Sequence, residues 1–198
     1  MNPSIKERIK REIKEWAEAL VIAGIGGLII TTFLIQAFKI PSSSMMPTFN
    51  IGDRLFVDKF LYSARVPFIN FRFPFPSVRQ PKRGDIIVFV STEERSKDLI
   101  KRLIALGGET VEIKEGRIYI NGKALDGPSS IRSVYYYNGG EYGKEGQAVT
   151  VPQDSYYVLG DNSANSRDSR YWGFVPKKNL IGRALIRHWP LNRIKVFK

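Results

Sequence analysis

The chain has 198 residues, of which 43% are hydrophobic, 12% aromatic and 25% charged. This composition is that of a globular protein with one sizeable core, and it argues against a disordered, collagen-like or coiled-coil chain. The 31 lysines and arginines outnumber the 19 aspartates and glutamates and give a formal net charge of +12. Such an excess favours an anionic partner, either nucleic acid or a lipid surface. With no cysteine and a single histidine, His188, the chain cannot form disulfides, thiolate metal sites or a zinc site of paired histidines.

Residues 19–38 are an uncharged stretch of 20 residues with the sequence ALVIAGIGGLIITTFLIQAF. In a helix that rises 1.5 Å per residue they would cover roughly 30 Å, the thickness of a bilayer hydrocarbon core. We therefore expect one N-terminal transmembrane helix. A buried soluble helix and a cleaved signal peptide are the alternatives, and the apolar region of a signal peptide is shorter, at about 7–15 residues. The anchor favours lipid over nucleic acid as the anionic partner.

Residues 1–18 have the pattern of an amphipathic helix, and they carry five basic residues against three in the 21 residues after the apolar stretch. By the positive-inside rule we expect a cytoplasmic N-terminus, a single pass through the plasma membrane, and residues 39–198 on the outer face. Residues 1–18 also hold four acidic residues, so their net charge is +1 and the rest of the chain carries +11. This charge predicts attraction of the outer domain to anionic membrane lipids.

Beyond residue 41 the pattern changes to short apolar runs that are typical of strands. Glu115-Gly116 and Asn121-Gly122 lie between such runs and predict two-residue hairpin turns. Since no long amphipathic helix follows the apolar stretch, we expect residues 39–198 to be a mainly β, antiparallel domain, with a small β cap at roughly residues 114–153. The predicted strands are 51–59, 85–90, 99–106, 110–113, 117–120, 155–159, 182–187 and 193–197.

Residues 60–76, with the sequence FLYSARVPFINFRFPFP, hold six aromatic residues and three prolines. This pattern fits a hairpin that covers the core. It also fits an aromatic ribbon that lies in the membrane interface, where aromatic rings with nearby arginines are favoured.

Three consecutive serines, Ser42 to Ser44, lie between Pro41 and Pro47. A run of serines after a membrane helix is often only a linker. Here two prolines restrict the backbone, and two methionines supply apolar surface where a flexible linker has polar residues. A rigid, partly apolar serine loop is suited to carry a nucleophile.

A nucleophilic serine needs a base, and Lys101 is the best candidate. Burial disfavours the ammonium form and lowers a lysine pKa that starts near 10.4. Lys101 lies in the otherwise apolar run DLIKRLIALGG, where strand alternation places it on one face with Leu99, Leu103 and Ala105, opposite Arg102. The alternative is a lysine at a strand edge whose amine extends to solvent.

Residues 160–176, GDNSANSRDSRYWGFVP, are a dense loop of small polar and charged residues. A calcium loop is disfavoured because the segment lacks the terminal glutamate and has arginines where carboxylates are needed. An Asp–Arg pair that holds a serine-rich loop in shape is the better interpretation. We expect no metal and no other cofactor.

Five segments in order make the chain resemble the type I signal peptidases, membrane-anchored Ser/Lys proteases that remove signal peptides from exported preproteins. They are the apolar stretch, PSSSMMPT (41–48), RGDIIVF (83–89), IKRLIALGGE (100–109) and residues 160–176. The resemblance covers nearly the whole chain and implies a β-rich protease core with a smaller cap. It also implies a serine endopeptidase that cleaves after small residues through an acyl-enzyme.

The resemblance implies that Ser44 is the nucleophile and Lys101 its general base. Ser42 and the backbone N–H of Ser44 would form the oxyanion hole. Ser44 lies six residues after residue 38, and an extended chain covers at most about 3.5 Å per residue, so the nucleophile would lie within roughly 20 Å of the membrane edge.

The resemblance further implies that Ser166 orients the lysine and that Asp168 and Arg170 form an ion pair that supports the site. The shallow pockets for small substrate side chains would be lined by Ile40, Met45 and Ile100.

Two other classes of function remain open. One is a membrane-tethered binding or assembly protein on the same fold, and the intact Ser44 and Lys101 argue against it. The other is a Ser/Lys protease with other substrates. A module that binds nucleic acid is disfavoured by the apolar stretch and by the expected location outside the cell.

Overall fold

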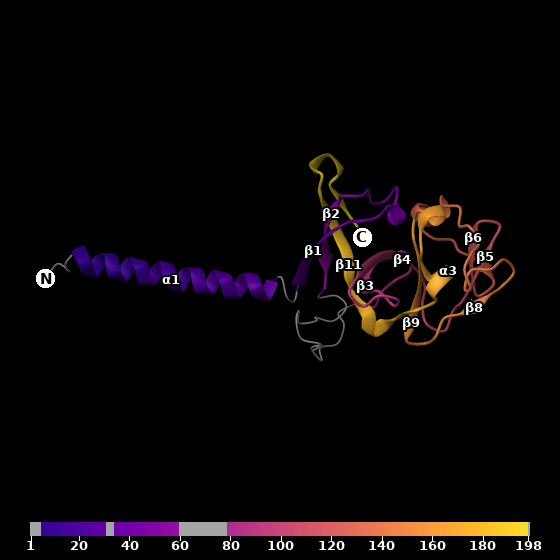
Figure 1. The fold of residues 1–198 in the computed structure, drawn as a ribbon, viewed down its shortest axis with the longest axis horizontal. Coiled ribbons are helices and arrows are strands. Elements are labelled where there is room, and N and C mark those ends of the chain that lie inside the picture. The colour runs from indigo at the N-terminus through magenta and orange to yellow at the C-terminus, as the bar shows by residue number, and fades with distance from the viewer. Residues whose placement is uncertain (1–4, 31–33, 60–78, 198) are drawn as a thin grey trace.

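The computed structural model describes residues 5–30, 34–59 and 79–197 (Figure 1). Helix α1 (Ile5–Ile29) extends away from a β-rich domain and leads into it at strand β1 (Ile35–Lys39). Across these described ranges, no helix combines the length and the apolar character that a membrane crossing requires. The predicted helix over residues 19–38 is wrong at its C-terminal end, because residues 35–38 belong to β1.

The strand conformation of β1 follows from its pairing. β1 lies antiparallel to β2 (Arg54–Asp58), with Ile35 opposite Asp58 and Lys39 opposite Arg54. Its Phe38 side chain packs against the core cluster that contains Leu55. Ladder hydrogen bonds and core contacts therefore hold this apolar segment as a strand.

The larger sheet has the strand order β1-β2-β11-β3-β4-β9-β10, with β12 paired to β11, and all of these pairs are antiparallel. The expected mainly β, antiparallel fold is thereby confirmed. Each of the eight predicted strand regions contains a strand. The remaining strands of this sheet are β3 (Ile86–Val90), β4 (Asp98–Ala105), β9 (Ser155–Leu159), β10 (Val175–Pro176), β11 (Leu180–Trp189) and β12 (Lys195–Val196).

A second, four-stranded sheet with the order β7-β6-β5-β8 forms the cap at the end of the domain opposite α1 (Figure 1). Both predicted hairpin turns are present. Glu115 and Gly116 have φ values of 51° and 73°, and Asn121 and Gly122 have 50° and 75°. Positive φ at both central residues is the type I′ geometry that matches the twist of the flanking strands. The cap strands are β5 (Thr110–Lys114), β6 (Arg117–Ile120), β7 (Lys123–Ala124) and β8 (Val149–Thr150).

After α1, the described part of the chain contains only short helices, and these lie in the connections. The two α-helical turns are α2 (Ser129–Arg132) and α3 (Ser169–Trp172), and the 3-10 turns are η2 (Ser43–Met45), η4 (Ser163–Asn165), η5 (Lys177–Asn179) and η6 (Leu191–Arg193). The two alternatives for residues 60–76 concern a segment that lies outside the described residues.

Strand β4 lies between two apolar clusters and thereby positions the predicted base. Lys101 pairs across the sheet with Ile87, and its neighbour Ile100 pairs with Val88. Ile87 and Val88 belong to different buried clusters, so Lys101 and Ile100 point to opposite faces of the sheet. The alternation of side chains between the two faces does not continue to Ala105, because the register of β4 with β9 shifts after Leu103. Ala105 therefore packs in a different cluster from Leu103, which corrects its predicted place on the face of Lys101.

Candidate active site

The side chains of Ser44 and Lys101 meet in the interior of the domain although they lie 57 residues apart in the chain. Lys101 Nζ donates a hydrogen bond of 2.6 Å to Ser44 Oγ. Both residues are buried, with exposed fractions of 7% for Ser44 and 4% for Lys101. A serine hydroxyl and an amine at this separation have the geometry of a nucleophile and its base.

The loop that carries Ser44 is fixed by the segment after β9. Ser44 lies in the 3-10 turn η2, where Met46 N donates to Ser43 O at 3.0 Å. Asn162 then holds the turn from outside: its backbone N donates to Ser44 O at 3.0 Å, and its Nδ2 donates to Ser43 O at 3.1 Å. The two predicted polar segments, residues 41–48 and 160–176, therefore form one unit.

The environment of Lys101 lowers its pKa to about 8. Burial is the main cause, because a site with little water disfavours the ammonium form. The negative charges of Asp168 and Asp161 act in the opposite direction, and the positive charge of Arg170 adds to the lowering. The amine is thereby brought close to the range in which it can accept a proton at neutral pH.

Ser42 lies beside the Ser44 hydroxyl. Its Oγ is 3.4 Å from Ser44 Oγ, and Ser42 is the extended residue that precedes the η2 turn. The structure therefore brings Ser42, the residue predicted to help form an oxyanion hole, next to the Ser44 hydroxyl.

Asp168, the residue that caps the start of α3, and Arg170 within α3 form a buried, bidentate ion pair. Arg170 Nε donates to Asp168 Oδ1 at 2.8 Å, and Arg170 Nη2 donates to Asp168 Oδ2 at 2.9 Å. The carboxylate also accepts from the backbone N of Gly160 at 3.0 Å. The same Nη2 also donates to the carbonyl oxygens of Ser163 and Ser166, at 2.7 and 3.1 Å, and Nη1 donates to Ser163 Oγ at 2.9 Å. The expected Asp–Arg pair is present, and it organises the whole loop.

Ser166 is buried in the same loop, and its Oγ has no hydrogen-bond partner among the described residues. The structure therefore places this residue at the site without showing the expected contact with the lysine. A methyl group on Gly160 would lie 2.2 Å from Ser166 Oγ and 2.5 Å from Ser44 O. Only glycine fits between the two serines.

The three residues expected to line substrate pockets share one apolar cluster. Ile40 and Met45 are buried in it, and Ile100 packs against it partly buried. Met45 follows Ser44 in η2, Ile40 lies shortly before this turn, and Ile100 precedes Lys101 in β4.

A second buried ion pair was missed in the sequence. Arg102 donates to both carboxylate oxygens of Asp161, at 2.7 and 2.6 Å, and to the carbonyl of Gly84 at 2.8 Å. Thr48 also donates to Asp161. The sequence did carry a signal, since Arg102 is a second charged residue in the same apolar run as Lys101. In the structure the two residues are equally buried. The network joins β4 to the serine loop and to the loop after β9.

Within the described ranges, no group of three or more His, Cys, Asp or Glu side chains could hold a metal ion.

The chain is similar to known signal peptidases. The family described as "Signal peptidase, peptidase S26" matches residues 13–189. The chain is 42% identical to the probable signal peptidase I-2 of Synechocystis sp. over 91% of this chain and 75% of that protein. It is 41% identical to signal peptidase I of Leptolyngbya laminosa over 92% of this chain and 82% of that protein. A crystal structure of a signal peptidase I from Enterococcus faecalis V583 aligns with a TM-score of 0.44 and 36% identity, over 53% of this chain and 97% of that one. The chain therefore belongs to the S26 family of signal peptidases, serine endopeptidases that remove signal peptides from preproteins.

Proposed function

We propose that this signal peptidase cleaves preproteins with Ser44 as nucleophile and Lys101 as general base. The observation that carries the proposal is the 2.6 Å hydrogen bond between the buried Lys101 amine and the Ser44 hydroxyl. The resemblance of the serine loop and of the β4 run to the family motifs supports the same assignment.

In the first half of the reaction, neutral Lys101 accepts the Ser44 proton while Oγ attacks the carbonyl carbon of the scissile bond. The resulting oxyanion is stabilised by the Ser44 backbone N–H and the Ser42 hydroxyl. The protonated Lys101 then donates its proton to the leaving amine, the C–N bond breaks, and the signal peptide remains as an ester on Ser44.

In the second half, neutral Lys101 takes a proton from a water molecule, whose oxygen attacks the ester carbonyl. Collapse of the tetrahedral intermediate breaks the bond to Ser44 Oγ, which regains a proton from the lysine. The products are the mature protein with a free amine and the signal peptide with a free carboxylate. Each proton that Lys101 accepts is returned, so the enzyme is regenerated.

The lowered pKa of Lys101 supports this role. At a pKa of about 8, roughly one lysine in five is neutral at pH 7.4, against about one in a thousand at the usual value of 10.5. Asp168 and Arg170 would support the site through their ion pair, which fixes the loop. The Ser166 hydroxyl would orient the lysine amine. Ile40, Met45 and Ile100, which share one apolar cluster, would line the shallow pockets for small substrate side chains.

Single replacements test the dyad. Ser44→Ala and Lys101→Ala should each abolish cleavage of a preprotein by the full chain in detergent micelles, because one lacks the nucleophile and the other its base. Ser43→Ala is the matched control, since the side chain of Ser43 makes none of the described contacts with the lysine. Substantial cleavage by either dyad variant would overturn the assignment.

We also propose that the apolar half of α1 anchors the enzyme in the plasma membrane, with the N-terminus cytoplasmic and the β domain on the outer face. Large apolar side chains of this half are exposed around the helix, which extends away from the domain (Figure 1): Leu20, Val21, Ile22, Ile25 and Leu28. Exposed apolar surface of this extent is typical of contact with lipid. The net charge of +11 on residues 19–198 fits attraction to anionic lipids.

Alkaline extraction of membranes tests the anchor. The full chain should stay in the membrane pellet, whereas a chain with Ile22→Asp and Ile25→Asp should be released. Ile51→Asp, a change at an exposed isoleucine of the β domain, is the control and should not release it. Added protease should digest the domain in intact spheroplasts if it lies outside. Release of the unaltered chain, or protection of the domain, would refute the proposed topology.

A further inference from the structure

A groove of about 440 Å³ lies between the serine loop, the loop after β9 and the cap. Met46 and Pro47 of the serine loop line one side, Tyr135 and Tyr137 of the cap line another, and Asn162 contributes from the loop after β9. Its volume is in the range of clefts that bind ligands. The catalytic steps above do not use it.

The groove lies next to the candidate active site, since two of its lining residues, Met46 and Asn162, are neighbours of Ser44. Asn162, which lines it, is the residue whose backbone and side chain hold the carbonyl oxygens of Ser44 and Ser43. Met46, on the other side, lies two residues after the nucleophile and is partly exposed. A peptide bound across Ser44 therefore reaches this groove directly on one side of the scissile bond.

The two tyrosines form a rigid, exposed aromatic surface. Tyr135 and Tyr137 are 59% and 54% exposed, and their ring centroids are 5.0 Å apart in an edge-on arrangement. The backbone beneath them is fixed, since Tyr137 N donates to Ser163 Oγ at 2.9 Å and Tyr137 O accepts from Arg170 Nη1 at 2.7 Å. The ion pair that organises the catalytic loop thus also holds this surface in place, and a preformed surface loses little entropy on binding.

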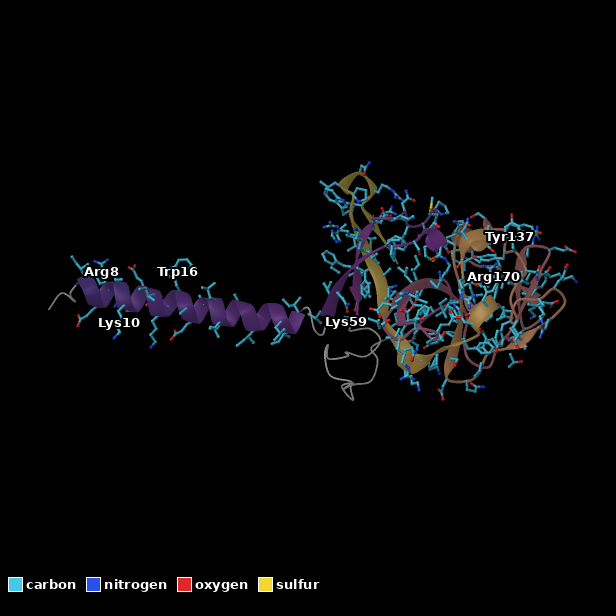
Figure 2. The ribbon with its side chains drawn as sticks, in the orientation of Figure 1. Arg8, Lys10, Trp16, Lys59, Tyr137 and Arg170 are labelled. Atoms are coloured by element: carbon cyan, nitrogen blue, oxygen red, sulfur yellow. The ribbon has the colours of Figure 1, made fainter. Side chains whose placement is uncertain are left out.

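The position of the groove indicates which end of a substrate reaches it. Figure 2 shows Tyr137 on the part of the domain far from α1, whereas Lys59 lies beside the end where α1 joins. In the proposed topology a signal peptide lies in the membrane with α1, so its end of the substrate approaches from the α1 side. The segment after the scissile bond then runs away from α1, toward the cap.

We propose that this groove binds the mature part of the preprotein, as an extended segment that begins just after the scissile bond, with Tyr135 and Tyr137 contacting its side chains. The inference rests on the proposed function of Ser44 and Lys101. The one carboxylate in the lining, Asp161, is already paired with Arg102. The groove therefore suits uncharged segments with an apolar or aromatic side chain, which can pack on exposed tyrosine rings.

Two peptide substrates test the proposal with the full chain in detergent micelles. Both carry the same signal-peptide sequence, but one ends at the first residue after the scissile bond. The other continues for about six residues, roughly 20 Å of extended chain, and includes apolar side chains. Tyr137→Ala should lower kcat/KM for the long peptide about tenfold, the effect of losing one aromatic packing contact, and leave the short peptide unchanged.

The choice of variants separates docking from folding. The Tyr135 ring lies against Gly116, so Tyr135→Ala can also loosen the cap. The hydrogen bonds of Tyr137 are made by its backbone, which makes Tyr137→Ala the primary variant and Tyr137→Phe its conservative rescue. Tyr119→Ala, a change in β6 of the cap outside the groove, is the matched control and should affect neither peptide.

The outcomes are distinct. Loss confined to the long peptide, with rescue by Tyr137→Phe, supports the proposal. Equal loss for both peptides, or no loss for either, overturns it while leaving the dyad assignment intact. If the unaltered enzyme cleaves neither peptide, the proposed function itself fails and this inference fails with it.

Discussion

Replacing the proposed base with an apolar residue should make the protein more stable at neutral pH while it destroys activity. The pKa of Lys101 is lowered from 10.5 to about 8, mainly by burial. One pKa unit corresponds to 1.36 kcal/mol, so holding the charged amine in the folded state costs roughly 3 kcal/mol at pH 7. Lys101→Met keeps a similar volume and removes this charge. We expect its free energy of unfolding to exceed that of the unaltered chain by up to about 3 kcal/mol.

The sign of the pH dependence makes this prediction specific. A lowered folded-state pKa means that the cost is fully present below about pH 8 and disappears as the pH rises toward 10.5, where the unfolded chain also loses the proton. Urea unfolding in detergent at pH 7 and at pH 10.5 measures the difference. Lys97→Met, at a lysine whose side chain is 66% exposed, serves as the control. No gain in stability at pH 7, or the same gain at both pH values, would refute the reasoning.

Three further predictions concern the site and its supports. The kcat/KM of the unaltered enzyme should rise with pH through an inflection near 8, since the base must be neutral, and a flat profile between pH 6 and 9 would contradict this. Gly160→Ala should lower kcat/KM about a hundredfold, because its methyl group would displace Ser166 Oγ or Ser44 O, and unchanged peptide cleavage would be the contrary result. Arg102→Met should lower the free energy of unfolding by roughly 3–5 kcal/mol because it leaves Asp161 buried and unpaired. Calorimetry should find that the double variant Arg102→Met, Asp161→Leu loses less unfolding free energy than Arg102→Met alone. An equal or larger loss in the double variant would contradict the proposed cause.

Local chemistry made several features predictable from the sequence. The Asn121-Gly122 turn was predictable because few residues other than asparagine and glycine adopt positive φ at both central positions of a hairpin. The burial of Lys101 was predictable because strand alternation places it on the same face as Leu99 and Leu103, which are both apolar. The pairing of Asp168 with Arg170 was predictable because the residues lie two positions apart in a dense polar loop.

Long-range pairing explains what was not predictable. Residues 35–38 continue an apolar run, and composition alone cannot distinguish the end of a membrane helix from a strand. Their pairing with β2, some 20 residues later, decides the conformation. The contact of Arg102 with Asp161 spans 59 residues and depends on how β4 meets the loop after β9. The groove at Tyr137 likewise exists only because the cap folds back beside the serine loop.

The most direct test of the central claim is to change the base while keeping its position. The chain contains no cysteine, so a single Lys101→Cys replacement can be alkylated selectively to an aminoethyl side chain. We expect the Lys101→Cys enzyme to be inactive and its alkylation to restore cleavage. The inflection of the pH profile of kcat/KM should then move to lower pH, because the sulfur atom lowers the pKa of the amine. Cleavage by the unmodified Lys101→Cys enzyme, or a restored enzyme with an unshifted inflection, would contradict the assignment of Lys101 as the base.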